Sequence, residues 1–207
     1  SSTGAPRERA EITVKPDGEI DLVIGTQPSG QGHETSFSQV AAEWLGVDVG
    51  CINVLMGDTK FVSVGGGSHS GRSMRLAGNV IVKAADAIIA KGKRMAGHIM
   101  EADAGDIEFK GGAFIISGTD RSLGIFELAA RAADADLPDD LQGGLAVGLD
   151  NEMHVPVFPN GSHVCEVEID TDTGVIELVR YTAIDDVGRA INPMIVDGQT
   201  HGGIVQG

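Results

Sequence analysis

Three glycine-rich segments hold the residues best suited to bind an anionic ligand. They are residues 30–35 (Gly-Gln-Gly-His-Glu-Thr), 65–73 (Gly-Gly-Gly-Ser-His-Ser-Gly-Arg-Ser) and 198–203 (Gly-Gln-Thr-His-Gly-Gly). Each reads as a turn aimed at the N-terminus of a helix, where backbone N–H groups and the positive end of the helix dipole favour phosphate. The spacing therefore predicts three anion sites that together hold one large, phosphate-bearing ligand.

The side chains within these segments support this interpretation but also allow simpler ones. Gln31 offers a donor and an acceptor, and Arg72 could pair with a phosphate in bidentate fashion. Alternatively, Arg72 is a surface residue at a helix start, and a lone Gly-Gln-Gly is an ordinary strand-to-helix turn. His33 and His201 could line a pocket, whereas the spacing of the other histidines favours no metal site.

A second candidate for chemistry is the pair Asp185–Asp186. Two adjacent carboxylates could act as acid and base. The same residues also suit the end of a strand, where aspartate stabilises a turn.

Hydrophobic periodicity predicts the elements that position these residues. Alternating apolar residues predict hairpins at 12–24, 107–116 and 163–183, and a buried strand at 51–56. The spacing of Phe37, Val40, Ala41 and Trp44 predicts a helix that ends at Gly46. Further helices are expected at 72–100, from a cap at Ser122 through 133, and after residue 192, with a long loop at 57–71.

The alternation of these elements predicts an α+β fold in which antiparallel β-hairpins pack on helices in two layers. We expect a first subdomain at 1–140, a linker or surface excursion at 141–160, and the start of a second, truncated subdomain at 161–207. The similar units around Gln31 and Gln199 suggest that the two subdomains are related by duplication.

Composition limits the possible partners. The 207 residues carry a formal net charge of −15, which disfavours binding to nucleic acid or anionic lipid. No apolar run is long enough for a membrane span, and the N-terminus does not resemble a signal peptide. A cytoplasmic location is therefore expected.

The glycine segments also carry a family resemblance that covers nearly the whole chain. Residues 185–193 (Asp-Asp-Val-Gly-Arg-Ala-Ile-Asn-Pro) and 198–207, with residues 30–35 and 70–73 in matching order and spacing, resemble the molybdenum-binding subunit of the xanthine dehydrogenase, aldehyde oxidase and carbon monoxide dehydrogenase family. The resemblance implies the molybdopterin-binding type of α+β domain, and a place in the C-terminal half of a molybdenum hydroxylase subunit.

The resemblance further implies which residues contact the cofactor, molybdopterin with molybdenum, in the cytosine dinucleotide form usual for bacterial members. No side chain would ligate the metal directly, because the dithiolene of the cofactor does so. The implied contacts are Gly30, Gln31, Gly32 and His33 from the first segment, Ser70, Gly71, Arg72 and Ser73 from the second, and Gln199 from the third.

The activity implied for the whole enzyme is hydroxylation of an aldehyde or an N-heterocycle with water as the oxygen source, or oxidation of carbon monoxide. The general-base glutamate of the family would lie in a later segment, so these 207 residues alone are expected to be inactive. The implied partners are the remainder of the molybdenum subunit and the 2Fe-2S and FAD domains or subunits, in a dimeric complex. Two alternatives stay open: a stand-alone phosphate- or nucleotide-binding module, and an assembly domain without cofactor contact.

Overall fold

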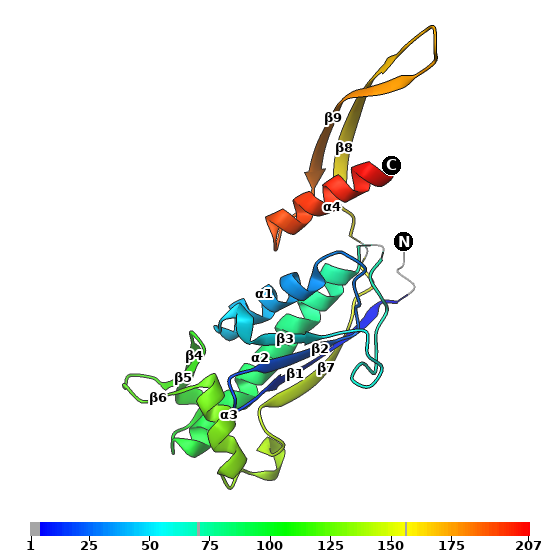
Figure 1. The fold of residues 1–207 in the computed structure, drawn as a ribbon. Coiled ribbons are helices and arrows are strands. Elements are labelled where there is room, and N and C mark those ends of the chain that lie inside the picture. The colour runs from blue at the N-terminus through cyan, green and yellow to red at the C-terminus, as the bar shows by residue number, and fades with distance from the viewer. Residues whose placement is uncertain (1–4, 70, 156) are drawn as a thin grey trace.

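The computed structural model describes residues 5–69, 71–155 and 157–207. The expected α+β fold is confirmed: a helix-covered sheet forms the body, a small sheet lies at one end, and a long hairpin projects from the other (Figure 1). The helices are α1 (His33–Leu45), α2 (Ser73–Ile99), α3 (Ile125–Asp134) and α4 (Pro193–Gln206). The strands are β1 (Arg7–Val14), β2 (Ile20–Ile24), β3 (Ile52–Leu55), β4 (Ile107–Lys110), β5 (Ala113–Ile116), β6 (Ser122–Gly124), β7 (Ala146–Glu152), β8 (Asn160–Ile169) and β9 (Ile176–Asp186).

The main sheet has the strand order β3-β2-β1-β7. β1 and β2 form the expected hairpin, and β3 adds in parallel to β2 as an edge strand, where only Ile52 is buried. Side chains alternate between the two faces of a strand. This period places Ala10, Ile12 and Val14 of β1 in the core beneath the helices.

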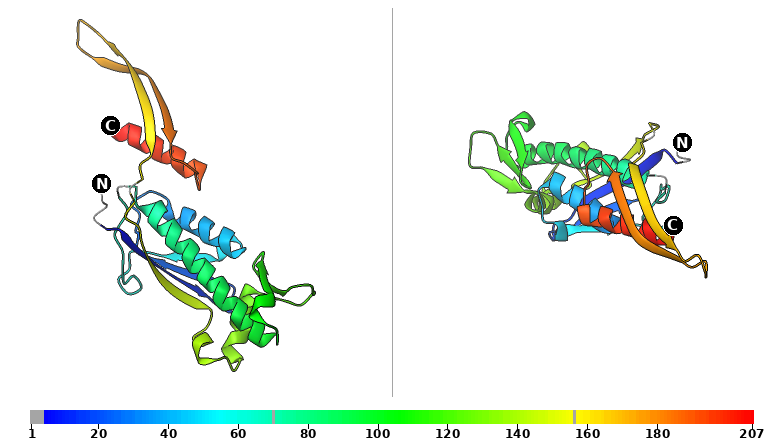
Figure 2. Two further views of the ribbon diagram at one scale, coloured as in Figure 1. Left: turned by 180° about the vertical axis from the view of Figure 1, so that it is seen from behind. Right: turned by 90° about the horizontal axis from the view of Figure 1, so that it is seen from above.

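Helices α1 and α2 cover one face of this sheet (Figures 1 and 2). α1 buries Phe37 and Ala41 as their spacing predicts, but Val40 is only half-buried and Trp44 is 45% exposed. The helix ends at Gly46, whose φ of 64° is the left-handed conformation that glycine adopts at low cost. α2 packs along β1 and β7, and its buried residues include Val80, Ala84 and Ile88. The body is therefore a two-layer α/β sandwich whose core lies between the sheet and the two helices.

Gly92 in α2 has a packing role, although glycine lowers helix propensity. A Cβ atom at Gly92 would lie 2.2 Å from Cζ of Phe114 in β5, a ring that is fully buried. The absence of a side chain lets the small sheet β4-β5-β6 pack closely on the helix.

The structure contradicts two predictions of secondary structure, at Ser122 and at residues 146–152. Ser122 does not cap a helix, because it is the first residue of β6 and pairs with Ile115 of β5, and α3 begins after Gly124. Residues 146–152, within the expected linker, form β7 and pair with β1 in the main sheet. β7 is only partly buried and contains charged residues, which hid its strand character.

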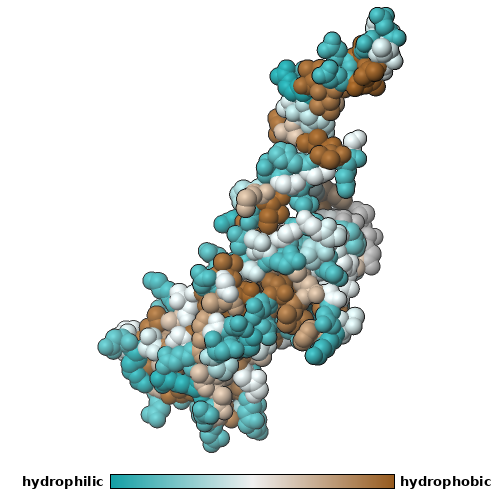
Figure 3. Space-filling view, viewed as in Figure 1, coloured by the Kyte–Doolittle hydropathy of each residue, from teal (hydrophilic) through white to brown (hydrophobic). Residues whose placement is uncertain are grey.

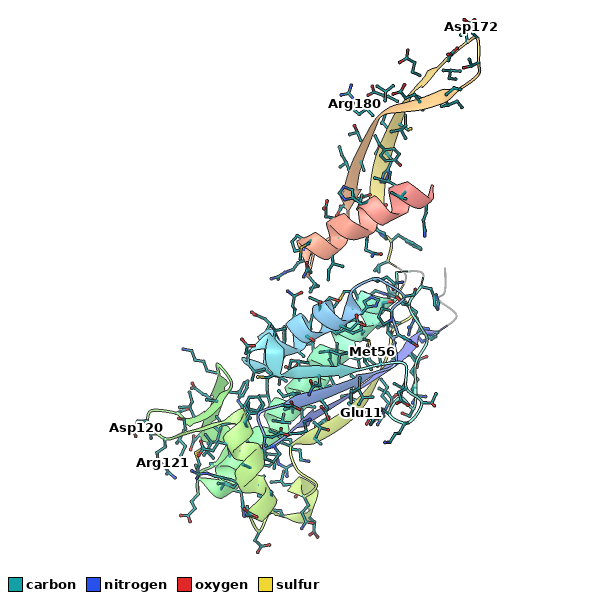
Figure 4. The ribbon with its side chains drawn as sticks, in the orientation of Figure 1. Glu11, Met56, Asp120, Arg121, Asp172 and Arg180 are labelled. Carbon is teal, nitrogen blue, oxygen red and sulfur yellow. The ribbon has the colours of Figure 1, made fainter. Side chains whose placement is uncertain are left out.

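The C-terminal hairpin β8–β9 is confirmed, and α4 lies across its base (Figure 1). Every residue of β8 is exposed. Arg180 of β9, labelled in Figure 4, forms an exposed ion pair with Glu166 of β8. Hydrophobic residues are visible on the surface of this projecting part (Figure 3). Its packing therefore differs from that of the body, which has a closed core.

The third glycine segment does not form a turn. Residues 198–203 lie inside α4, which begins at Pro193. Gln31, in contrast, lies in a loop before α1. Because the two units have different local structures, the duplication hypothesis is wrong.

Within the described ranges, no helix combines the length and apolar character that crossing a bilayer requires.

We predict that Gly92→Ala lowers the free energy of unfolding by about 1–3 kcal/mol, because the new methyl group must displace the buried ring of Phe114. Gly78→Ala in the same helix is the matched control. Its Cβ would meet only the flexible end of Met74, at 3.2 Å, and should stabilise the helix by about 0.5–1 kcal/mol. Urea unfolding of both variants measures this, and equal effects would contradict the packing role.

Candidate functional site

The first glycine loop (residues 25–32) and α4 meet around a cavity of about 580 Å³. Nε2 of Gln199 donates to the carbonyl oxygen of Gly30 at 3.4 Å, across 169 positions of sequence. Ile195 packs against Gly32 so closely that a Cβ there would lie 3.0 Å from Cδ1 of Ile195. The polar lining residues are Gln31, His33, Ser36, His163, Tyr181, Asp185, Arg189, Asn192, Gln199 and Thr200.

The N-terminus of α1 opens toward this cavity. Gly32, directly before the helix, has φ 68° and ψ 31°, and no side chain caps the first turn. The first N–H groups of a helix have no partner within it and carry partial positive charge. His33 and Ser36 of this first turn line the cavity, so the geometry suits an anionic group.

His33 contributes an unpaired polar atom. The residue is only 6% exposed, and among the described residues its Nδ1 has no hydrogen-bond partner. Its ring stacks on Phe37 with the ring centroids 4.8 Å apart. Burial lowers the pKa of His33, and the nearby Glu34 opposes this shift. A buried polar atom without a partner is costly, so Nδ1 of His33 would gain stability from a hydrogen bond to a bound group.

The two glutamines flank the same cavity, and each uses one of its two hydrogen-bonding groups within the chain. Oε1 of Gln31 accepts from the backbone N–H of Ser29 at 2.5 Å. Gln199 donates to Gly30. Each amide retains a second group for recognising a polar edge.

A polar network fixes α4 across the hairpin. His163 contacts the Tyr181 hydroxyl through Nδ1 and Asp185 through Nε2, each at 3.0 Å. Thr200 of α4 donates to the other oxygen of Asp185 at 3.1 Å. The hydrogen bond with His163 is the largest cause of a lowered pKa of Asp185, and the hydrogen bond from Thr200 adds to this effect. Asp186 instead accepts from the backbone N–H of Gly188, so the two carboxylates have separate structural contacts.

The start of α4 is fixed to α1. The side chain of Asn192 accepts from the N–H of Ile195 as a helix cap and donates from Nδ2 to Gln39 at 3.0 Å. Pro193 occupies the first turn, where its missing N–H is not needed. Asp185 and Asn192 lie in segment 185–193, and Thr200 lies in the third glycine segment. His163 and Tyr181 lie in no such motif, and only their places on the two strands of a hairpin could have suggested them.

The second glycine loop (residues 57–72) reaches a neighbouring groove of about 1500 Å³. Gly71 lines this groove, and Met74 lines both the groove and the cavity. Ser73 donates to Ser68 at 2.8 Å, while Ser70 lies outside the described residues. The first and third segments are thus in contact, and the second lies beside them.

Arg72 requires a correction. Its side chain is fully buried and ion-paired with Glu8, and its N–H groups donate to acceptors of this chain. No guanidinium N–H is left for the bidentate phosphate contact that the sequence suggests. Sequence reasoning missed Glu8, although its alternation with Ala10 and Ile12 placed this carboxylate on the buried face of β1.

Within residues 5–69, 71–155 and 157–207, no three His, Cys, Asp or Glu side chains gather in a way that could hold a metal ion. The polar atoms around the cavity instead suit an organic ligand with an anionic part. The geometry thus defines an α+β module with a ligand cavity between a helix N-terminus and a second helix.

Comparison with known proteins identifies the family to which this chain belongs. The family profile described as "Molybdopterin cofactor-binding domain" matches residues 1–207. The chain therefore belongs to the molybdopterin-binding domains of the xanthine dehydrogenase, aldehyde oxidase and carbon monoxide dehydrogenase family.

Two relatives of known function support the same family by sequence identity. The chain is 35% identical to the carbon monoxide dehydrogenase large chain of Afipia carboxidovorans, over 96% of this chain and 25% of the relative. It is 33% identical to the nicotine 6-hydroxylase large subunit of Paenarthrobacter nicotinovorans, over 100% of this chain and 26% of the relative.

Solved structures share the fold. A Cu,Mo-CO dehydrogenase aligns with a TM-score of 0.83 at 36% identity, covering 95% of this chain and 25% of that one. Quinoline 2-oxidoreductase from Pseudomonas putida aligns with a TM-score of 0.81 at 33% identity, covering 96% and 25%. The chain spans about a quarter of the length of the relatives that it matches.

We predict a pH dependence of stability from His33. Because burial lowers its folded pKa below the unfolded value of about 6.5, the folded state favours the neutral imidazole. As the pH falls, the unfolded state binds the proton first, so this contribution is complete above about pH 6.5 and is lost as the pH falls through the folded pKa.

The measurement is urea unfolding of the wild-type chain and of His33→Asn between pH 5 and 7.5, without phosphate. The stability of the wild type relative to the variant should decrease toward pH 5. Histidine side-chain NMR reports the same titration directly. A relative stability that increases toward low pH would show that His33 is protonated in the fold.

Proposed function

We propose that the cavity between the first glycine loop and α4 holds the molybdopterin cofactor of a molybdenum-dependent oxidoreductase. The observation that carries the proposal is the buried, unpaired Nδ1 of His33, beside an uncapped helix N-terminus and two glutamine amides. The family membership supports the same ligand.

Each residue has a distinct part in this proposal. The backbone at Gly30 and Gly32, with the first turn of α1, suits the phosphates. Gln31, His33 and Gln199 supply hydrogen bonds to polar edges of the ligand. Gly71 and Ser73, with Ser70 between the described ranges, extend the contacts from the second loop. When bound, the cofactor supplies the redox chemistry, and these residues bind and orient it.

For the whole enzyme, we propose hydroxylation of an aldehyde or N-heterocycle, or oxidation of carbon monoxide. Carbon monoxide dehydrogenase, nicotine 6-hydroxylase and quinoline 2-oxidoreductase are among the relatives. The cofactor would be the cytosine dinucleotide form, with 2Fe-2S and FAD carried by other domains or subunits of a dimeric, cytoplasmic complex. The catalytic base would come from other polypeptide, so residues 1–207 alone would not turn over substrate.

We predict that Gln31→Ala, His33→Ala and Gln199→Ala each weaken cofactor binding by about tenfold, the effect of losing one hydrogen bond of about 1.4 kcal/mol. Molybdenum and pterin per subunit are measured in the purified full-length enzyme, together with cytidine monophosphate released by acid hydrolysis. His33→Asn places an amide near the position of Nδ1 and should retain more cofactor than His33→Ala.

Gln206→Ala is the matched control, because Gln206 lies on α4, two turns beyond Gln199, and does not line the cavity. Its cofactor content should equal that of the wild type. Unchanged content in the three cavity variants would contradict the proposal and favour an assembly role. Nucleotide binding by the isolated chain, without any pterin in the full enzyme, would favour a stand-alone nucleotide module.

A further inference from the structure

A fully buried ion pair joins the first strand to the start of the longest helix. Nη2 of Arg72 lies 3.0 Å from Oε2 of Glu8, and both side chains are 0% exposed. Glu8 is on the inward face of β1, and Arg72 is the N-cap residue of α2. Buried charges of this kind persist only when they are paired and hydrogen-bonded.

The guanidinium of Arg72 has its full set of five donors in use. Nε donates to the carbonyl oxygen of Ala5, and Nη2 to that of Arg7 as well as to Glu8. Nη1 donates to the Thr26 hydroxyl at 3.2 Å and to the carbonyl oxygen of Gly67 at 2.5 Å. One side chain therefore connects β1, the first glycine loop and the second glycine loop.

Thr26 completes the network. Its hydroxyl donates to Oε2 of Glu8 at 2.6 Å while accepting from Arg72. Thr26 follows Gly25 in the first loop and is 0% exposed. The two glycine loops thus share one buried polar centre, made of Glu8, Thr26 and Arg72.

Two glycines of the second loop leave no room for a side chain where they pack against this polar centre and the first loop. A Cβ on Gly66 would lie 2.8 Å from Cζ of Arg72. A Cβ on Gly65 would lie 2.4 Å from the carbonyl oxygen of Gly25. These contacts require a bare backbone, so the loop can lie on the guanidinium and on the first loop only where glycine is present.

We propose that Arg72, held by Glu8 and Thr26, is a positioning residue for cofactor binding. It fixes the second glycine loop beside the first and does not itself contact the cofactor phosphates. This inference rests on the proposed function, since it concerns the geometry of the same site. It assigns Glu8, a residue of the first strand, an indirect part in cofactor retention.

The test uses the full-length enzyme with Glu8→Gln, Thr26→Val and Arg72→Lys. Two quantities are measured: hydrogen–deuterium exchange of residues 57–71, and molybdenum and pterin per subunit. All three variants should raise exchange in this loop at least tenfold and lower cofactor content together. Glu127→Gln, which breaks the exposed pair of Glu127 with Arg131, is the matched control and should change neither quantity.

Two results would overturn the inference. If Arg72→Lys alone loses cofactor while Glu8→Gln and Thr26→Val keep it, Arg72 is a direct ligand. If loop exchange rises while cofactor content stays at the wild-type level, the loop position does not govern binding. Thr26→Val keeps both charges, so it gives a result even if the charge variants fail to fold. Failure of the proposed function is recognised separately, from unchanged cofactor content in Gln31→Ala and Gln199→Ala.

Discussion

The buried pair of Glu8 and Arg72 is the interaction on which the arrangement of the glycine loops depends. A carboxylate on the inward face of β1 is unfavourable unless a cation meets it. Arg72 enters the core at the start of α2 and pairs with this carboxylate, while Gly66 and Gly67 lie against its guanidinium and Gly65 lies against Gly25. Strand, helix and both loops are therefore fixed by one electrostatic requirement.

The cavity has a different origin. It forms because α4 returns from the projecting hairpin and contacts the first loop through Ile195 and Gln199. α4 contains three glycines and buries none of its residues, so its own helix propensity is low. Asn192 and the His163–Asp185–Thr200 network hold it in place. The site thus combines a rigid body with an element that is fixed mainly by polar contacts at its edges.

Much of the fold follows from local patterns. The alternation in residues 12–24 and the helical spacing of residues 37–45 each reflect burial against one neighbouring layer, and hydrophobic periodicity detects burial of this kind well. β7 escaped this reasoning because it is partly exposed and its partner β1 is more than a hundred residues away. The glycines of residues 198–203 predict a turn, because glycine marks turns in most contexts, whereas the cap at Asn192 starts the helix before them.

The sequence by itself determined the fold class, the family and the presence of Gln31, His33 and Gln199 in segments suited to cofactor binding, because residue type and spacing are local properties. The tertiary structure alone decided which of these residues meet and which do not. It brought Gln199 to Gly30, left Nδ1 of His33 buried without a partner among the described residues, and turned Arg72 inward to Glu8. The physical reason is that the partners of a buried charge, or of a ligand, come from distant strands and helices, and only folding brings them within hydrogen-bonding distance.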